Sequence, residues 1–206
     1  MSNIEIEARA LLSLEKREEM LGYMHTLGEV KKINRVMIDF SGENRQRTVV
    51  LRIDNGQQQL IAKTGSLSDM VRREAQITVG PTNSLEQTLG YLEIMGYTHA
   101  MLSLRSMFVV KAERVEYSMR DVLHHDTHER VSTLIEIEAL TVAEGAEEVA
   151  SQEIHAALVA HDLLPLGKTD WEQWVKETYE KVDRPFGNSH ENAKTLTASL
   201  IKFIDT

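Results

Sequence analysis

The segment 3–10 alternates apolar and charged residues without interruption, and this alternation constrains the fold more than any other feature of the chain. Successive side chains of a β-strand point to opposite faces of the sheet. One face of the predicted strand therefore carries four apolar side chains, and the other carries Glu5, Glu7 and Arg9. The pattern predicts a strand that packs one face into a core and presents carboxylates and a guanidinium group on the other.

A second stretch of the same kind lies far away in the sequence, at 133–139, where Glu136 and Glu138 share one face of an apolar strand. Four carboxylates from two strands could converge on a hard cation such as Mg²⁺ or Mn²⁺. Contact with water explains a polar strand face equally well, and it is the commoner state of a half-exposed sheet. Both interpretations stay open at the level of the pattern.

Composition narrows the class of protein. The chain has 206 residues, 42% of them hydrophobic and 27% charged, as in ordinary globular proteins. The absence of cysteine excludes disulfides, thiolate metal sites and cysteine nucleophiles. The chain shows no apolar run of the roughly 20 residues that a membrane span needs and no secretory signal, and its net charge of -9 disfavours non-specific nucleic-acid binding. We expect a cytoplasmic protein with neither nucleic acid nor membrane as a partner.

Apolar periodicity and turn residues predict a series of strands interrupted and followed by helices. Asn55-Gly56 predicts a hairpin turn, Ser84 with Gln87 predicts a capping box, and Gly96 predicts a helix end. The expected strands are 3–10, 35–40, 49–53, 59–63, 71–79, 100–111, 114–121 and 132–140, and the expected helices are 14–27, 84–95, 146–161, 170–181 and 195–204. The prediction is an α+β fold on a mostly antiparallel sheet.

The same strand alternation groups the other charges. Arg52 shares a face with Asp54, Glu74 shares one with Gln76, and Arg114 shares one with Arg120. If the sheet curls and these faces point inward, the interior holds carboxylates and cations together, which is costly unless they pair or bind something. Carboxylates suit Mg²⁺ or Mn²⁺, and arginine and lysine suit phosphate oxygens, so such an interior fits a metal–polyphosphate complex.

Several motifs, in order, resemble those of the CYTH superfamily, the triphosphate tunnel metalloenzymes, over roughly residues 3–165. The opening Glu5-Ile-Glu7-Ala-Arg9 resembles the ExExK signature. Further resemblances follow in the segments 51–53 ("LRIR"), 60–65 ("LTxKG"), 73–76 ("RxExE"), 89–97 ("LLexLGF") and 121–138 ("lDxV…fxEiE").

The resemblance implies an eight-stranded antiparallel β-barrel that forms a tunnel, with flanking and C-terminal helices. It implies a tunnel domain at 1–165 and a C-terminal helical extension, 166–206, packed on the barrel. Carried over residue by residue, it implies metal ligands at Glu5, Glu7, Glu136 and Glu138, with Glu5, Glu7 and Arg9 as the catalytic set. The implied phosphate contacts are Arg9, Arg52, Lys63 and Arg105, and the implied further tunnel residues are Glu74 and Asp121.

This chain departs from the family pattern at several positions. Arg9 stands where the signature has lysine, Asp54 reverses the charge of the second arginine of "LRIR", and Gln76 replaces a glutamate. Arg105 is what remains of a paired "KxR". The implied metal ligands therefore match the family motifs better than the implied phosphate contacts do.

Three functions follow as hypotheses. The first is a Mg²⁺- or Mn²⁺-dependent hydrolase of inorganic, nucleoside or thiamine triphosphate. The second is a class IV-type adenylyl cyclase that makes cyclic AMP from ATP. The third, motivated by Asp54 and Gln76, is a degenerate member that binds a phosphorylated ligand without turnover, in which Asp54→Arg should raise activity. The expected partner is a small phosphorylated molecule, and a homodimer is an open alternative.

Two further features invite an interpretation. The run of His124, His125, Asp126 and His128 is rich in metal-ligand types, but a polar loop between strands is the commoner explanation. Trp171 and Trp174 lie on one face of a predicted helix, where packing against the rest of the fold is more common than a partner surface.

Overall fold

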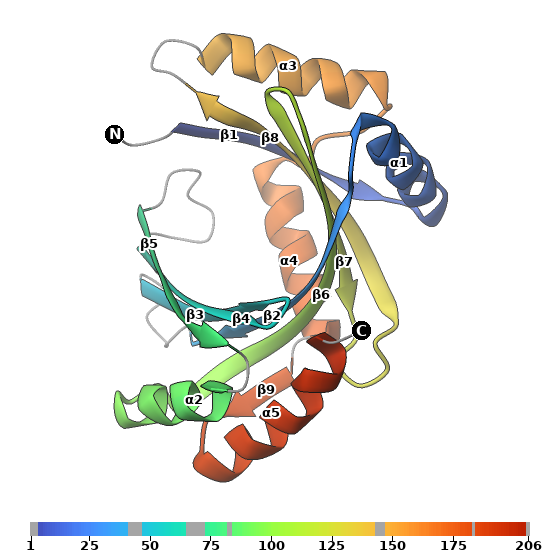
Figure 1. Ribbon diagram of the computed structural model, residues 1–206. Coiled ribbons are helices and arrows are strands. Elements are labelled where there is room, and N and C mark those ends of the chain that lie inside the picture. Colours follow the sequence, from blue (N-terminus) through green and yellow to red (C-terminus); the bar gives the residue numbers. More distant parts are fainter. Residues whose placement is uncertain are drawn as a thin grey trace. The chain divides into compact units, whose positions relative to one another are not determined.

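The computed structural model describes residues 4–40, 47–64, 73–81, 84–142, 147–182 and 184–204. Its strands form one sheet in the hydrogen-bonded order β1-β8-β7-β6-β2-β3-β4-β5, and β9 pairs with β6 (Figure 1). Every pairing whose register is recorded in the described part is antiparallel. The strands are β1 (Ile4–Leu12), β2 (Lys31–Asp39), β3 (Arg47–Asp54), β4 (Gln57–Thr64), β5 (Arg73–Pro81), β6 (His99–Ala112), β7 (Val115–Leu123), β8 (Arg130–Val142) and β9 (Arg184–Gly187).

Five helices accompany the sheet in the described part of the chain. They are α1 (Leu14–Leu27), α2 (Leu85–Ile94), α3 (Glu147–Ala160), α4 (Lys168–Val182) and α5 (His190–Ile204). The predicted α+β class, with an antiparallel sheet and flanking and C-terminal helices, is confirmed. In the described part, hydrogen bonds do not close the sheet, because β1 and β5 are the two ends of the strand order.

Two elements differ most from the sequence prediction. The last helix begins at His190, five residues before the predicted start. The short strand β9 was missed because its sequence, Arg-Pro-Phe-Gly, contains two residues that strands disfavour and shows no alternation. Its edge pairing with β6 is a tertiary effect, which local pattern does not report.

The chain divides into two compact units, and the first consists of Met1–Ile33, Ser106–Val122 and Arg130–Thr178. In this unit β1 and β8 pair along their length, and α3 packs against both strands (Figure 1). The even-numbered face of β1 contributes Ile6, Ala8 and Ala10 to a core that also holds Ile135 and Ile137 of β8. The predicted core face of the segment 3–10 is therefore confirmed for these residues.

The second unit consists of Asn34–Arg105, Leu123–Glu129 and Tyr179–Thr206. Here α2 and α5 lie side by side (Figure 1). Their apolar residues form one core with a single face of β2 and β3, represented by Val36, Ile38, Leu51 and Ile53. The opposite face of these strands carries the polar residues described below.

Local turn chemistry mostly follows the prediction. Asn55 and Gly56 both have positive φ, 44° and 85°, as the hairpin between β3 and β4 requires. Gly96, with φ 91°, follows the last helical residues of α2, and the amide of Tyr97 donates to the carbonyl of Leu92. The capping box is corrected: the Ser84 side chain makes no capping bond and instead donates to the carbonyl of Pro81 at 2.8 Å.

None of the helices in the described ranges combines the length and apolar character needed to cross a membrane. The expected domain boundary at 165/166 stays a prediction. After that position, the first residues of α4 belong to the first unit, whereas β9 and α5 belong to the second.

Candidate functional site

The pairing of β1 with β8 brings the two acidic segments of the sequence together. Arg9 lies directly opposite Glu136, and Glu7 lies directly opposite Glu138. Directly opposed residues of an antiparallel pair project from the same face of the sheet. The alternation places this face opposite the one that carries Ile6 and Ala8 into the core. Glu7 and Arg9 of β1 therefore lie on the same face of the sheet as Glu136 and Glu138 of β8.

Glu136 is the centre of this cluster. Its side chain is only 5% exposed, and the Nε of Arg9 donates to its Oε1 at 3.1 Å. Arg120 of β7 forms an ion pair with its other oxygen. A buried carboxylate is stable only when it is compensated by charge and hydrogen bonds, and two guanidinium groups supply both here.

Arg9 also forms an ion pair with Glu7, so its guanidinium group bridges carboxylates of two strands. Glu7 and Glu138 face each other across the strands, and two like charges in that position repel unless a cation lies nearby. Counted together, three carboxylates share this face with two guanidinium groups. Carboxylate and guanidinium groups are therefore mixed on this face, where Glu7 and Glu136 both pair with arginine.

Glu5, the remaining implied metal ligand, belongs to β1, and its side chain lies outside the described residues. Carboxylate oxygens are the ligands that Mg²⁺ and Mn²⁺ prefer, so the described donor set fits such an ion. Bound metal would compete with Arg9 and Arg120 for the oxygens of Glu136.

A second polar cluster lies in the second unit, on the face of β2, β3 and β4 opposite the core. The Nε of Arg52 donates to Oε1 of Gln59 at 2.8 Å, and its Nη2 donates to Gln76 at 3.1 Å. The same Nε lies 3.4 Å from Asp54, which also receives two bonds of 2.7 Å from Arg35. Arg52 is therefore held by neutral amides and by a carboxylate that it shares with Arg35.

The other implied phosphate residues are placed by their strands. Lys63 of β4 lies opposite Glu74 of β5 in the strand register, but both side chains are outside the described set. Arg105 is a partly buried residue of β6 in the second unit.

Asp121 does not join the carboxylate cluster. It lies on the face of β7 opposite Arg120, where Oδ1 accepts from the Nε of Arg17 at 2.9 Å and from the hydroxyl of Thr133 at 2.6 Å. The bond from Asp121 is the main cause that raises the pKa of the Arg17 guanidinium, against the opposing effect of burial. This buried pair links α1 to β7, and the tunnel role that the resemblance implied for Asp121 stays a prediction.

Two arginines of the clusters were not among the predicted site residues. Arg120 was placed on a face with Arg114 by strand alternation, but only the pairing of β7 beside β8 shows that it reaches Glu136. Arg35 carries no motif, and its position opposite Asp54 depends on the register of β2 with β3. Alternation along each strand predicts which face a side chain occupies. It does not predict the register between strands, which brings Arg120 and Arg35 to their partners.

The histidine-rich loop is accounted for by its own contacts. One donor atom from each of His124, His125 and Asp126 lies within 4.8 Å of the other two. Backbone amides of Asp126 and Thr127 donate to Nδ1 of His124 at 3.3 and 3.4 Å, and Arg184 lies 3.9 Å from Asp126. These interactions favour the polar-loop interpretation over a zinc site.

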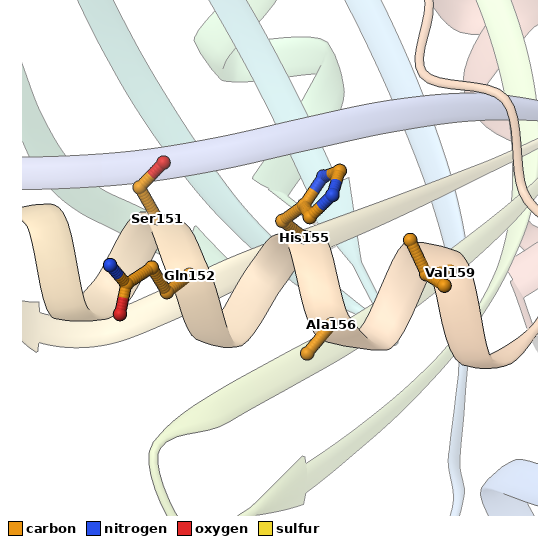
Figure 2. Close-up of a pocket in the computed structure, with 5 residues that line it drawn as sticks. All are labelled: Ser151, Gln152, His155, Ala156 and Val159. Atoms are coloured by element: carbon orange, nitrogen blue, oxygen red, sulfur yellow. The ribbon is translucent and has the colours of Figure 1, made fainter.

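A shallow depression on α3 contains no acidic or basic cluster. It is lined by five residues of that one helix, shown in Figure 2: Ser151, Gln152, His155, Ala156 and Val159. Because these side chains include no carboxylate or arginine, the depression lacks the chemistry predicted for the site.

Comparison with known proteins supports the fold. The PH1012 protein from Pyrococcus horikoshii OT3 matches with a TM-score of 0.57 and 14% identity, over 78% of this chain and 92% of that one. The inorganic triphosphatase NE1496 matches with a TM-score of 0.40 and 14% identity, over 72% of this chain and 80% of that one. A Bacillus halodurans protein proposed to be an adenylate cyclase matches with a TM-score of 0.49 and 14% identity, over 80% of this chain and 93% of that one.

The chain shares its fold with the Pyrococcus protein. Neither the protein families nor the curated proteins compared with this chain contain a match.

Proposed function

We propose that this protein is a metal-dependent hydrolase of a triphosphate: inorganic triphosphate, a nucleoside triphosphate or thiamine triphosphate. The observation that carries the proposal is the cluster around Glu136. A buried carboxylate held by Arg9 and Arg120, beside the opposed carboxylates of Glu7 and Glu138, offers ligands for a cation and donors for phosphate on one sheet face. Transfer of a phosphoryl group to water depends mainly on positioning and charge neutralisation, which such a cluster provides.

The metal ligands in this proposal are Glu7, Glu136 and Glu138, together with Glu5. When bound, Mg²⁺ or Mn²⁺ neutralises phosphate oxygens and orients a water molecule. In this proposal the carboxylates bind the cation, and the guanidinium groups bind the phosphate groups of the substrate. Glu7 and Glu136 would hold the cation, and the guanidinium donors of Arg9, which pair with both carboxylates, would be available to bind phosphate.

Arg9 and Arg120 are the phosphate-binding candidates of the first unit. Arg52, Lys63 and Arg105 are added by the resemblance to the CYTH superfamily. Arg52 contacts the neutral amides of Gln59 and Gln76, which do not neutralise its charge, and it shares the carboxylate of Asp54 with Arg35.

Adenylyl cyclase activity is the second candidate function, and it rests on the same resemblance. It needs a surface that recognises base and ribose, which no described residue identifies. A non-catalytic ligand-binding role is the third, and the pairing of Asp54 with Arg35 weakens its motivation, because the reversed charge has a partner on the neighbouring strand.

The test is phosphate release from inorganic triphosphate, ATP and thiamine triphosphate with Mg²⁺ or Mn²⁺, in the wild type, Glu136→Gln and Glu7→Gln. We expect metal-dependent release that falls at least about 100-fold in both variants, since each removes a metal ligand. Glu153→Gln is the matched control, because it removes a partly exposed glutamate of the first unit that pairs with Arg114.

Glu7 is less buried than Glu136, so its variant keeps the test valid if Glu136→Gln unfolds. Cyclic AMP and pyrophosphate from the ATP sample would favour the cyclase instead. Folded wild type that releases neither product, but binds inorganic triphosphate in calorimetry, would favour the binding role.

A further inference from the structure

The indole ring of Trp171 covers the guanidinium group of Arg9. The Cζ atom of Arg9 lies 4.6 Å from the centroid of the ring, within the range of a cation–π contact. The edges of the same group bind Glu136 and Glu7. Three partners therefore define both the position and the plane of this side chain.

Trp171 is itself held on its other side. Its ring stacks with that of Trp174 at a centroid distance of 5.1 Å and an interplanar angle of 27°. The Nε1 of Trp174 donates to the hydroxyl of Ser132 at 3.0 Å. Ser132 and Glu136 are both even-numbered residues of β8, so this bond attaches the tryptophan pair to the face that carries the carboxylate.

The backbone joins α4 to the same place. The amide of Leu166 donates to the carbonyl of Arg9 at 2.7 Å, and the amide of Trp171 donates to the carbonyl of Gly167 at 2.9 Å. The segment that leads into α4 is thus fixed to the backbone of Arg9, and Trp171 in the first turn of α4 contacts its side chain. A helix packed only for core burial would need no such contact with a charged residue.

We propose that Trp171 is a positioning residue of the candidate site, which fixes the plane of the Arg9 guanidinium group for a polyphosphate anion. This inference rests on the proposed function. A free arginine side chain samples many rotamers, whereas a stacked one presents its donors in one orientation. Since Arg9 binds phosphate both before and during the reaction, the loss of Trp171 should raise KM more than it lowers kcat.

The first measurement is the affinity for inorganic triphosphate in Mg²⁺, by calorimetry, with KM and kcat for the same substrate. A cation–π contact of ordinary strength predicts that Trp171→Ala weakens binding roughly 2- to 30-fold. Trp171→Phe keeps a ring and should recover most of the affinity. Glu172→Ala, at the neighbouring exposed position of α4, is the control and should bind as the wild type does.

The second measurement needs no ligand. The Nε–H resonance of Arg9, assigned by its loss in Arg9→Lys, should show a ring-current shift that disappears in Trp171→Ala and remains in Glu172→Ala. If the Arg9 resonance keeps its chemical shift in Trp171→Ala, the contact between Arg9 and Trp171 is overturned. A change in the stability of the variant does not by itself remove a ring-current shift, so a movement of the resonance reports the contact.

The two proposals fail in different ways. A wild type that binds triphosphate, with Trp171→Ala binding equally well, overturns the positioning role and leaves the proposed function intact. A folded wild type that binds no triphosphate overturns the proposed function, and the positioning role with it.

Discussion

Arg35 and Asp54 face each other across β2 and β3 and form a two-pronged ion pair, with both N···O distances at 2.7 Å. Asp54 also lies 3.4 Å from Arg52. The aspartate that reverses the charge of a family motif therefore joins two arginines on neighbouring strands. The motif has an arginine at position 54 of β3, and in this chain Arg35 lies opposite that position on β2.

This pairing changes what the variant Asp54→Arg should do. As an isolated departure from the motif, it would be expected to raise activity. In the structure, the change removes the partner of Arg35 and adds a third positive charge beside it. We expect a loss of about 2–3 kcal/mol in the free energy of unfolding, because charged hydrogen bonds are lost and like charges approach. Urea denaturation measures it.

The charge-swapped double variant Arg35→Asp/Asp54→Arg is the control, because it restores an opposite pair at the same two positions. It should recover part of the stability lost in Asp54→Arg. A single variant as stable as the wild type and more active would contradict the structural role of the pair.

The buried pair of Arg17 and Asp121 is expected to stabilise the first unit. Asp121 is 6% and Arg17 is 9% exposed at the side chain. In Asp121→Asn the guanidinium group keeps a hydrogen-bond acceptor and its pair with Glu18 but loses its buried counter-charge, so we expect a loss of about 3 kcal/mol in the free energy of unfolding. Chemical denaturation of the variant checks this value.

An exposed pair on the same helix gives the matched comparison. Lys16 and Glu19 of α1 lie 2.8 Å apart at the surface, and such pairs contribute about 0–1 kcal/mol. Glu19→Gln should therefore leave stability nearly unchanged. Equal losses in the two variants would show that burial of the Arg17–Asp121 pair has no special effect.

The sequence predicted which face of its strand a side chain occupies, but it did not predict contacts between side chains of different strands. The alternation at 3–10 correctly separates the core residues Ile6 and Ala8 from Glu7 and Arg9, because the side-chain period of a strand is fixed by its backbone. The contact of Arg120 with Glu136 depends on how β7 lies beside β8. No local pattern encodes that register, so the second arginine of the cluster stayed unrecognised.

The same distinction explains Asp121 and Trp171. A motif placed Asp121 in the tunnel, whereas its odd position on β7 puts it opposite Arg120 and under α1. The spacing of Trp171 and Trp174 predicted one helix face correctly, but the contact of that face with Arg9 requires the path of the chain from β8 through α3 to α4. Contacts between residues that are distant in sequence become visible only when the fold is known.

His161 should make the stability of the protein depend on pH. Burial is the main cause that lowers its pKa, and the charge of Lys16 lowers it further, against the opposing charge of Glu19. Because the pKa is lower in the folded state, the unfolded chain takes up a proton first as the pH falls below about 6.5. The contribution to stability is complete above that value and is lost as the pH falls through the folded pKa.

Urea denaturation at pH 7.5 and 5.5 tests this sign. The loss of stability between the two values should be smaller in His161→Gln than in the wild type. His155→Gln, at an exposed position of α3, should keep the wild-type difference. A larger loss in His161→Gln than in the wild type would reverse the inferred direction.

Arg120 should compete with a metal ion for Glu136. In the described structure this carboxylate is 5% exposed and is compensated by Arg9 and Arg120. Arg120→Ala leaves a buried carboxylate with less compensating charge, so the melting temperature without metal should fall. A divalent cation held by Glu136, as proposed, would replace the missing charge in the folded state, so the rise in Tm on adding Mn²⁺ or Mg²⁺ should be larger in Arg120→Ala than in the wild type.

The double variant Arg120→Ala/Glu136→Gln separates this competition from a general loss of packing. With the carboxylate neutral, the metal-induced rise in Tm should shrink below the wild-type value, although the arginine is absent in both variants. Equal rises in the wild type, Arg120→Ala and the double variant would mean that metal binds elsewhere on the protein. In that case Glu136 would be a structural carboxylate, held by its two arginines in the same way that Asp121 is held by Arg17.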